Sequence, residues 1–244
     1  MVESGIRGGL SVVCTKYAKA NNPRIKGYEP EKPTSHCIYL DANNLYGWAM
    51  SQKMPYSDHK WLKQSEIQQF DVTTISDESD VGYILEVDLH YPKELHDLHN
   101  DFPAAPVQRN ISSSEWSNHT QKLAETFHLK VGSGKLVADL HHKEKYVVHY
   151  RNLKLYMKLG LKLMKIHRII AFNQSFWLRD YIELNTAKRK NAKNAFEKDF
   201  FKLMNNPCFE KQWKMFAKEL IYNLSTKKVH LKSLLVVHSL NVHG

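Results

Sequence analysis

The residues with the clearest chemical character lie at positions 39–46, which read Tyr-Leu-Asp-Ala-Asn-Asn-Leu-Tyr. A short apolar run precedes Asp41, so we expect this carboxylate at the end of a strand, just before a turn into a helix. A carboxylate in that place can hold Mg²⁺, and the free backbone N–H groups of the turn can face phosphate oxygens. The ring of Tyr46 could pack against a sugar. The alternative is a structural role, in which Asp41 only caps the next helix.

A second group of residues with a chemical character is basic and lies between Thr186 and Asn206. Its cations are Lys188, Arg189, Lys190, Lys193, Lys198 and Lys202, and its apolar residues include Phe196, Phe200 and Leu203. On one helix, the last four lysines would share one half of the helical wheel and the apolar residues the other half. A helix with its apolar face buried and its lysines exposed suits a triphosphate or a DNA backbone. An ordinary amphipathic surface helix has the same pattern.

The net charge of +10 comes from one part of the chain. Residues 144–218 carry 17 Lys and Arg against 6 Asp and Glu, a local charge of +11, which leaves −1 for the rest. Such a concentration is typical of proteins that bind polyphosphates such as nucleic acids. A solvated basic surface is the alternative.

Several functional classes do not agree with the sequence. No run of about 18 apolar residues is present, so we expect no membrane partner. The first ten residues lack the apolar core of a secretory signal, and the cysteines are Cys14, Cys37 and Cys208, an odd number at wide spacing. These features argue against a disulfide framework or a cysteine zinc site. We therefore expect an intracellular protein, in the nucleus or cytoplasm, that is not secreted.

The elements that must position these residues include both strands and helices. Strands are predicted at 37–40, 83–89 and 161–172, and a hairpin is predicted from 136–140 and 146–150. Helices are predicted at 43–50, at 151–159 before Gly160, and at 176–206, with a break near 185–186 and an end at Pro207. We expect 57–80 to form a surface insertion and 91–120 an extended loop. The expected fold class is α+β.

The order of these two groups resembles the protein-primed branch of family B DNA polymerases, found in viruses, linear plasmids and self-synthesising DNA transposons. Motif A of that family has Asp, two variable residues, Ser or Asn, Leu and Tyr, as in Asp41 to Tyr46. Motif B has Lys, three residues, then Asn, and here it begins at Lys202 and reaches Asn206. Ile6 to Gly9 is similar to the family's aromatic-x-Gly-Gly element, which touches the template.

The resemblance implies a partial polymerase palm with an antiparallel sheet and a helical fingers segment. It implies a turn-rich lead-in at 1–35, a palm segment with motif A at 36–70, an inserted subdomain at 71–150, basic fingers helices with motif B at 151–211 and a divergent tail at 212–244. The implied activity is template-directed DNA synthesis with Mg²⁺. The implied partners are a DNA primer–template, a dNTP and a terminal protein primer.

The resemblance also assigns roles to single residues. Asp41 would be the catalytic metal ligand. Residues that would bind the nucleotide are Leu45, Tyr46, Lys190, Lys202 and Asn206. Residues that would bind DNA are Arg7, Gly8, Gly9, Lys193 and Lys198.

Some positions depart from the family pattern. The Ser and Gly of motif B are replaced by Pro207 and Glu210, and no aspartate follows Asp199, so the Asp-Thr-Asp of motif C has no counterpart. Two-metal phosphoryl transfer needs carboxylates from two places to hold ions about 4 Å apart. Asp41 alone cannot do this, and we expect Asp88 to face solvent on its strand. The alternative is therefore a non-catalytic DNA-binding or nucleotide-binding remnant of a mobile-element or viral polymerase; a metal nuclease would need a second carboxylate cluster.

Overall fold

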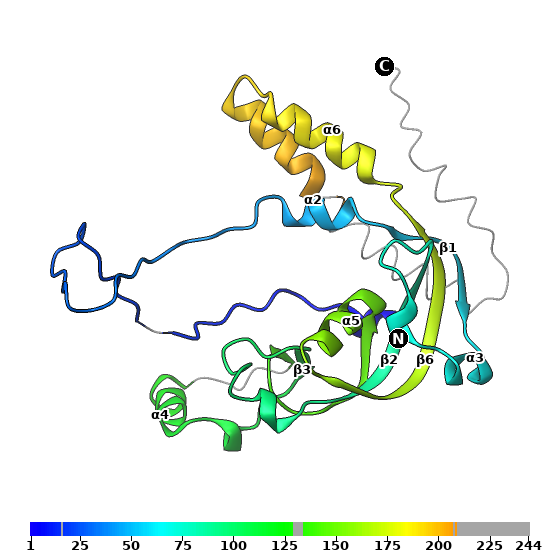
Figure 1. The fold of residues 1–244 in the computed structure, drawn as a ribbon, viewed down its shortest axis with the longest axis horizontal. Helices are drawn as coiled ribbons and strands as arrows, with labels where there is room; N and C mark the ends of the chain where they lie inside the picture. Colours follow the sequence, from blue (N-terminus) through cyan, green and yellow to red (C-terminus); the bar gives the residue numbers. More distant parts are fainter. Residues whose placement is uncertain (16, 129–133, 207, 209–244) are drawn as a thin grey trace.

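A four-stranded antiparallel sheet forms the centre of the computed structural model, which describes residues 1–15, 17–128, 134–206 and 208 (Figure 1). The strand order is β1-β6-β2-β5. The strands are β1 (Met54–Trp61), β2 (Val81–His90), β5 (Lys143–His149) and β6 (Lys162–Ser175). Helices accompany this curled sheet, which confirms the predicted α+β class. Within the described residues, no helix is both long enough and apolar enough to cross a membrane.

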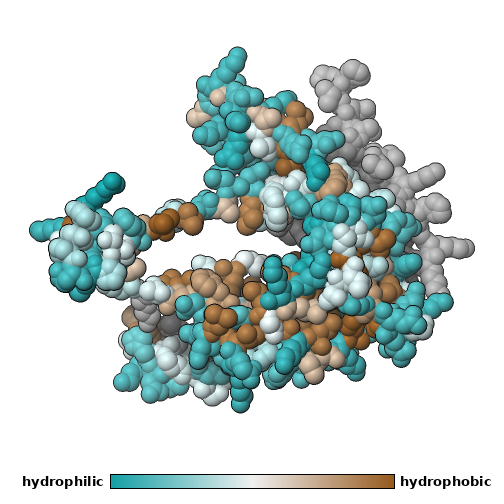
Figure 2. Space-filling view, in the orientation of Figure 1, coloured by the Kyte–Doolittle hydropathy of each residue, from teal (hydrophilic) through white to brown (hydrophobic). Residues whose placement is uncertain are grey.

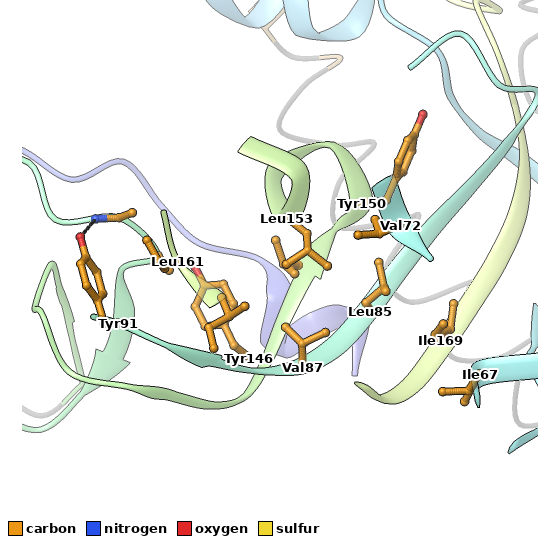
Figure 3. Packing of buried hydrophobic residues seen from close by; sticks show 14 residues of the cluster. Ile67, Val72, Leu85, Val87, Tyr91, Tyr146, Tyr150, Leu153, Leu161 and Ile169 are labelled. Carbon is orange, nitrogen blue, oxygen red and sulfur yellow. Dashed lines mark hydrogen bonds between the residues drawn. The ribbon is translucent and has the colours of Figure 1, made fainter. Parts of the chain in front are cut away.

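The main core lies between one face of the sheet and α5 (Tyr150–Lys158) (Figure 3). Alternate residues of β2 and β6, such as Leu85, Val87 and Ile169, are fully buried there against Leu153 of α5. Burying each of these side chains contributes about 1.5–3 kcal/mol. The predicted helix end at Gly160 is confirmed, because this residue has a φ of +101°, a conformation that favours glycine after a helix.

The N-terminal segment packs on the sheet and contacts its edge strand β5. Val2 of α1 (Val2–Gly5) is buried with residues of β6, and the Arg7 guanidinium donates to the Val147 carbonyl of β5 at 2.8 Å. The same guanidinium stacks on the Tyr146 ring, 3.9 Å from its centroid. Apolar packing by Val2 and the two Arg7 contacts therefore anchor the N-terminal segment to the sheet.

Three predictions about strands are wrong. Ile38, Tyr39 and Leu40 are 76%, 91% and 85% exposed and form no strand, because they have no neighbouring strand among the described residues. The expected hairpin does not form: β4 (Lys135–Val137) pairs with β3 (Val107–Arg109), whereas β5 pairs with β2. The expected surface insertion at 57–80 instead begins inside β1, which pairs with β6.

The segment expected as a loop at 91–120 also contains regular structure. It holds η2 (Lys93–Leu95), β3, η3 (Ser113–Glu115) and the start of α4 (Asn118–Phe127). Between β1 and β2 lie α3 (Gln64–Gln68) and η1 (Val72–Thr74). Of these elements, α3, η1, η2 and β3 contribute side chains to the main core, whereas η3 and α4 have no buried residue.

The basic segment forms two helices rather than one. α6 (Arg179–Lys190) ends before a turn, and a second helix occupies 195–206, antiparallel to α6 (Figure 1). The break therefore lies at 191–194 and not at 185–186. Asn194 accepts a bond from the Glu197 N–H at 2.8 Å, and the Glu197 carboxylate accepts one from the Lys193 N–H at 2.9 Å. This reciprocal capping starts a new helix. The expected end at Pro207 falls outside the described residues, as do Glu210 and the 212–244 tail.

A buried charge cluster joins the β3–β4 pair to β5. The Lys143 side chain is 1% exposed and donates to the carboxylate of Asp139 and, at 2.9 Å, to its carbonyl. Arg109 of β3 donates to the same carboxylate at 3.1 Å. Burial alone would raise the pKa of Asp139, but the hydrogen bonds and positive charge of Lys143 outweigh it and hold that pKa below its usual value.

We predict that Asp139→Asn lowers the free energy of unfolding by about 3–5 kcal/mol at pH 7, because it leaves a buried lysine without its charge partner. Because the pKa of Asp139 is lowered in the folded protein, its ionised carboxylate stabilises the fold at pH values above about 4, the ordinary aspartate pKa. This stabilisation is lost as the pH falls further. The difference in the free energy of unfolding between Asp139→Asn and wild type should therefore become smaller at acidic pH. Urea unfolding at several pH values measures it.

Glu29→Gln is the matched control. Its carboxylate pairs with Lys32 at 2.5 Å, and the Lys32 and Glu29 side chains are 60% and 44% exposed. An exposed pair contributes about 0–1 kcal/mol. Equal losses for the two variants would contradict the prediction.

Candidate functional site

The helix of motif A, α2 (Leu45–Met50), packs against α6. Met50 is buried against Leu178 and Ile182. The Arg179 side chain donates to the Ser51 carbonyl at 3.2 Å, and the Asn44 amide donates to the Thr186 hydroxyl at 3.4 Å. Apolar packing and these two hydrogen bonds therefore fix α2 along α6.

The turn before α2 depends on Asn44 and Gly47. Asn44 has a φ of 57° and a ψ of 39°, the left-handed conformation that asparagine tolerates better than most residues. Its amide folds over the buried Gly47, where an added Cβ would lie 2.4–2.6 Å from the amide atoms. These two residues therefore shape the turn whose free backbone N–H groups are predicted to face phosphate oxygens.

A hollow of about 350 Å³ lies between α2 and α6. It is lined by Asn43, Asn44, Gly47, Trp48, Ser51, Ile182, Glu183, Thr186, Ala187 and Lys190. The Lys190 ammonium and the asparagine amides can donate hydrogen bonds to an anionic group. Trp48, which is largely exposed, offers a flat apolar surface. The hollow can therefore accept a small ligand that combines a phosphate with a planar ring.

The structure places Lys190 at this hollow and the other predicted nucleotide-binding residues elsewhere. Asp41 is exposed on the extended segment before α2. Leu45 and Tyr46 are about half exposed and do not line the hollow. Lys202 is exposed on the second helix, and Asn206, near its end, is half-buried. The roles assigned to these residues by resemblance stay predictions.

The predicted lysine stripe does not lie on one helix. Lys190 ends α6, Lys193 lies in the turn, and Lys198 and Lys202 belong to the second helix. The expected burial of the apolar face is wrong as well. Phe196, Phe200 and Leu203 are exposed, since the second helix contacts α6 through other residues, such as Asn205.

The predicted DNA-binding residues near the N-terminus occupy two environments. Arg7 is engaged with β5 and Tyr146, as described above, and is half-buried. Gly8 and Gly9 are exposed, with open space where a Cβ would be. Their contact with template stays a prediction.

Among the described residues, no group of three or more His, Cys, Asp or Glu could hold a metal ion. Asp88 is half-buried on β2, where its carboxylate accepts the Lys145 N–H at 2.8 Å and lies 2.8 Å from His167. Asp88 is thus committed to contacts on the sheet and does not face solvent freely. The described residues therefore do not form a protein-only two-metal site around Asp41.

The sequence analysis did not predict the polar contacts that hold α6 and the second helix together. The buried side chains of Asn185 and Asn205 share a hydrogen bond of 3.1 Å. The Tyr181 hydroxyl donates to the Met204 carbonyl at 3.2 Å, and burial raises the pKa of that hydroxyl. The Asn194-x-x-Glu197 capping pattern could have predicted the turn, and with it the antiparallel pairing.

Comparison with known proteins gives one family match. A family model described as DNA polymerase type B, organellar and viral, matches residues 23–209. The match includes motif A, all four strands of the sheet, α6 and the second helix. No curated protein and no solved structure matches the chain.

We predict that Asn185→Ala and Asn205→Ala each lower the local opening free energy of the second helix by about 1–3 kcal/mol, because each leaves a buried amide unpaired. The double variant should lower this opening free energy little more than either single variant does, since Asn185 and Asn205 share one hydrogen bond. Hydrogen exchange of the amides of residues 195–206 measures this energy. The exposed Asn191→Ala is the control. Fully additive losses would show that the pair does not act as a unit.

Proposed function

The chain belongs to the organellar and viral type B DNA polymerases, and from this premise we propose that it takes part in template-directed DNA synthesis by binding a dNTP between α2 and α6. The observation that carries this proposal is the hollow itself. It joins the turn of motif A to a lysine of the fingers segment, two parts of the chain about 140 residues apart.

The chain's own residues would bind and orient the nucleotide. Lys190 would donate to phosphate oxygens, as a lysine does in many phosphate sites. Trp48 would provide a surface for the sugar or base. The Asn44–Thr186 bond would keep the two walls at a fixed separation. Positioning, together with electrostatic stabilisation, is most of what a protein contributes to phosphoryl transfer.

Use of a divalent cation is general in this family, and Mg²⁺ would neutralise charge on the triphosphate. We assign contact with the ion to Asp41, which lies at the start of the motif A turn. The described residues bring no further pair of ligands together with it. They therefore hold at most part of such a metal site.

The exposed lysines of the fingers segment support DNA as the second partner. Lys193, Lys198 and Lys202 are exposed on the second helix and its preceding turn. Lys193 and Lys198 would contact phosphates of the primer–template, whereas Lys202 is the residue that the resemblance assigns to the nucleotide. Initiation from a terminal protein and an origin in a viral or transposon polymerase belong to the same proposal and rest on the resemblance of motif A.

A second candidate function is DNA or nucleotide binding without catalysis. It is favoured by the absence of a three-ligand metal group among the described residues and by the replacement of motif B residues by Pro207 and Glu210. It predicts salt-dependent DNA binding without nucleotide incorporation.

We predict that Lys190→Ala weakens dNTP binding at least about ten-fold, which corresponds to the loss of one charge-assisted hydrogen bond. Titration calorimetry with a dNTP and Mg²⁺ measures the affinity. Lys122→Ala removes an exposed lysine on α4 and serves as the control. If Lys190→Ala binds the dNTP as tightly as wild type does, the hollow is not the nucleotide site.

Primer extension separates the two candidate functions: catalysis predicts that the purified chain extends a primer on a DNA template with Mg²⁺ or Mn²⁺ and that Asp41→Asn loses this extension. Asp97→Asn, an exposed aspartate away from motif A, should retain it. Gel analysis of labelled primers measures extension, and circular dichroism verifies folding. A folded wild-type chain that retards DNA without extending the primer would favour the second candidate function.

A further inference from the structure

A loop stands away from the rest of the molecule. The distal loop, defined here as residues 17–35, is flanked by extended segments that connect it to α1 on one side and to α2 on the other (Figure 1). Figure 2 shows open space between the segment leading to α2 and the body of the protein. The loop therefore presents its side chains without cover from the sheet or the fingers helices.

The distal loop has a defined shape because Asn21 bonds across it. The Asn21 amide donates to the carbonyls of Glu29, Lys32 and Pro33 at 2.9–3.3 Å, and its oxygen accepts the Glu29 N–H at 3.0 Å. Asn21 also pairs with Ser35 through its backbone, which closes the loop at its base. A loop fixed in this way loses little conformational entropy when it binds a partner.

Positive charge is concentrated on this loop. It carries four Lys and Arg against two Glu. Lys32 and Glu29 form an ion pair of 2.5 Å and so neutralise each other. The remaining cations, Lys19, Arg24 and Lys26, are exposed.

The turn at Gly27 lies beside one of these cations. Gly27 has a φ of +82°, a conformation that favours glycine. A Cβ at this position would lie 3.7 Å from the Lys19 ammonium, so Lys19 reaches over the backbone next to Lys26. The folded loop thus places the Lys19 ammonium beside residue 27, which follows Lys26 directly in the sequence.

An aromatic ring lies beside these cations in the sequence. Tyr17, two residues before Lys19, is 77% exposed. Cations combined with exposed aromatic rings are typical of surfaces that bind single-stranded nucleic acid, where the cations contact phosphates and unpaired bases stack on the rings. Duplex DNA offers phosphates but keeps its bases stacked inside.

We propose that the distal loop binds the single-stranded part of the template, with Lys19, Arg24 and Lys26 on its phosphates and Tyr17 on a base. This inference rests on the proposed function for the identity of the nucleic acid. It adds a contact region that lies outside the hollow, motif A and the fingers lysines.

The test compares two triple variants. Lys19→Gln, Arg24→Gln and Lys26→Gln remove the loop charges, whereas Lys93→Gln, Lys122→Gln and Lys135→Gln remove three exposed lysines elsewhere. Binding is measured by fluorescence anisotropy at several salt concentrations, with a single-stranded oligonucleotide and with a blunt duplex. Circular dichroism verifies folding.

We expect the loop variant to bind single-stranded DNA at least about ten-fold more weakly at 0.1 M salt and the control variant to bind within about two-fold of wild type. The slope of log K against log salt should fall by about 2 in the loop variant, because each phosphate contact with a single strand contributes about 0.7. Blunt-duplex binding should change little.

Equal losses in the two triple variants, or no loss in the loop variant, would overturn the inference while leaving the proposed function intact. An equal loss on the blunt duplex would overturn the assignment to single strands. A folded wild-type chain that binds neither DNA would overturn both the inference and the proposed function, whereas failure of primer extension alone would leave the inference standing.

Discussion

Strand β6 pairs with two neighbours along its 14 residues, and the other elements take their positions from this pairing. Its register with β1 places Met54 opposite Ser175. α2 ends at Met50, shortly before β1 begins, and α6 starts at Arg179, shortly after β6 ends. The two helices therefore leave the same end of one strand pair and must meet there. The hollow between them is thus a consequence of strand register.

Local signals in the sequence predict much of the secondary structure but little of its pairing. The helix at 151–159 and its end at Gly160 are confirmed, since periodicity and a C-terminal glycine are signals within a few residues. β6 agrees closely with the strand predicted at 161–172. The failed hairpin of 136–140 and 146–150 shows the limit, because an alternating pattern predicts a strand without predicting its partner.

The candidate site could be predicted in part for the same reason. The charge distribution and the order of the motifs predict that Lys190 and the turn after Asp41 belong to the site. They do not indicate the contact between Asn44 and Thr186, whose partners are 142 residues apart, or the pairing of Asn185 with Asn205 across a turn. The strand predicted before Asp41 failed because an apolar run becomes a strand only where another strand can accept its hydrogen bonds.

α6 is packed against α2 near its first residues, and its last residue lies at the rim of the hollow. The helix is held at its base by Leu178 and Ile182 against Met50, and Lys190 lies at its far end. With 12 residues, it is about 18 Å long. A rotation of about 10° at the base would move the end by roughly 3 Å, and the Asn44–Thr186 hydrogen bond, one turn before Lys190, opposes that rotation. The width of the hollow at Lys190 therefore depends on this one bond, whereas beside Met50 it depends on apolar packing.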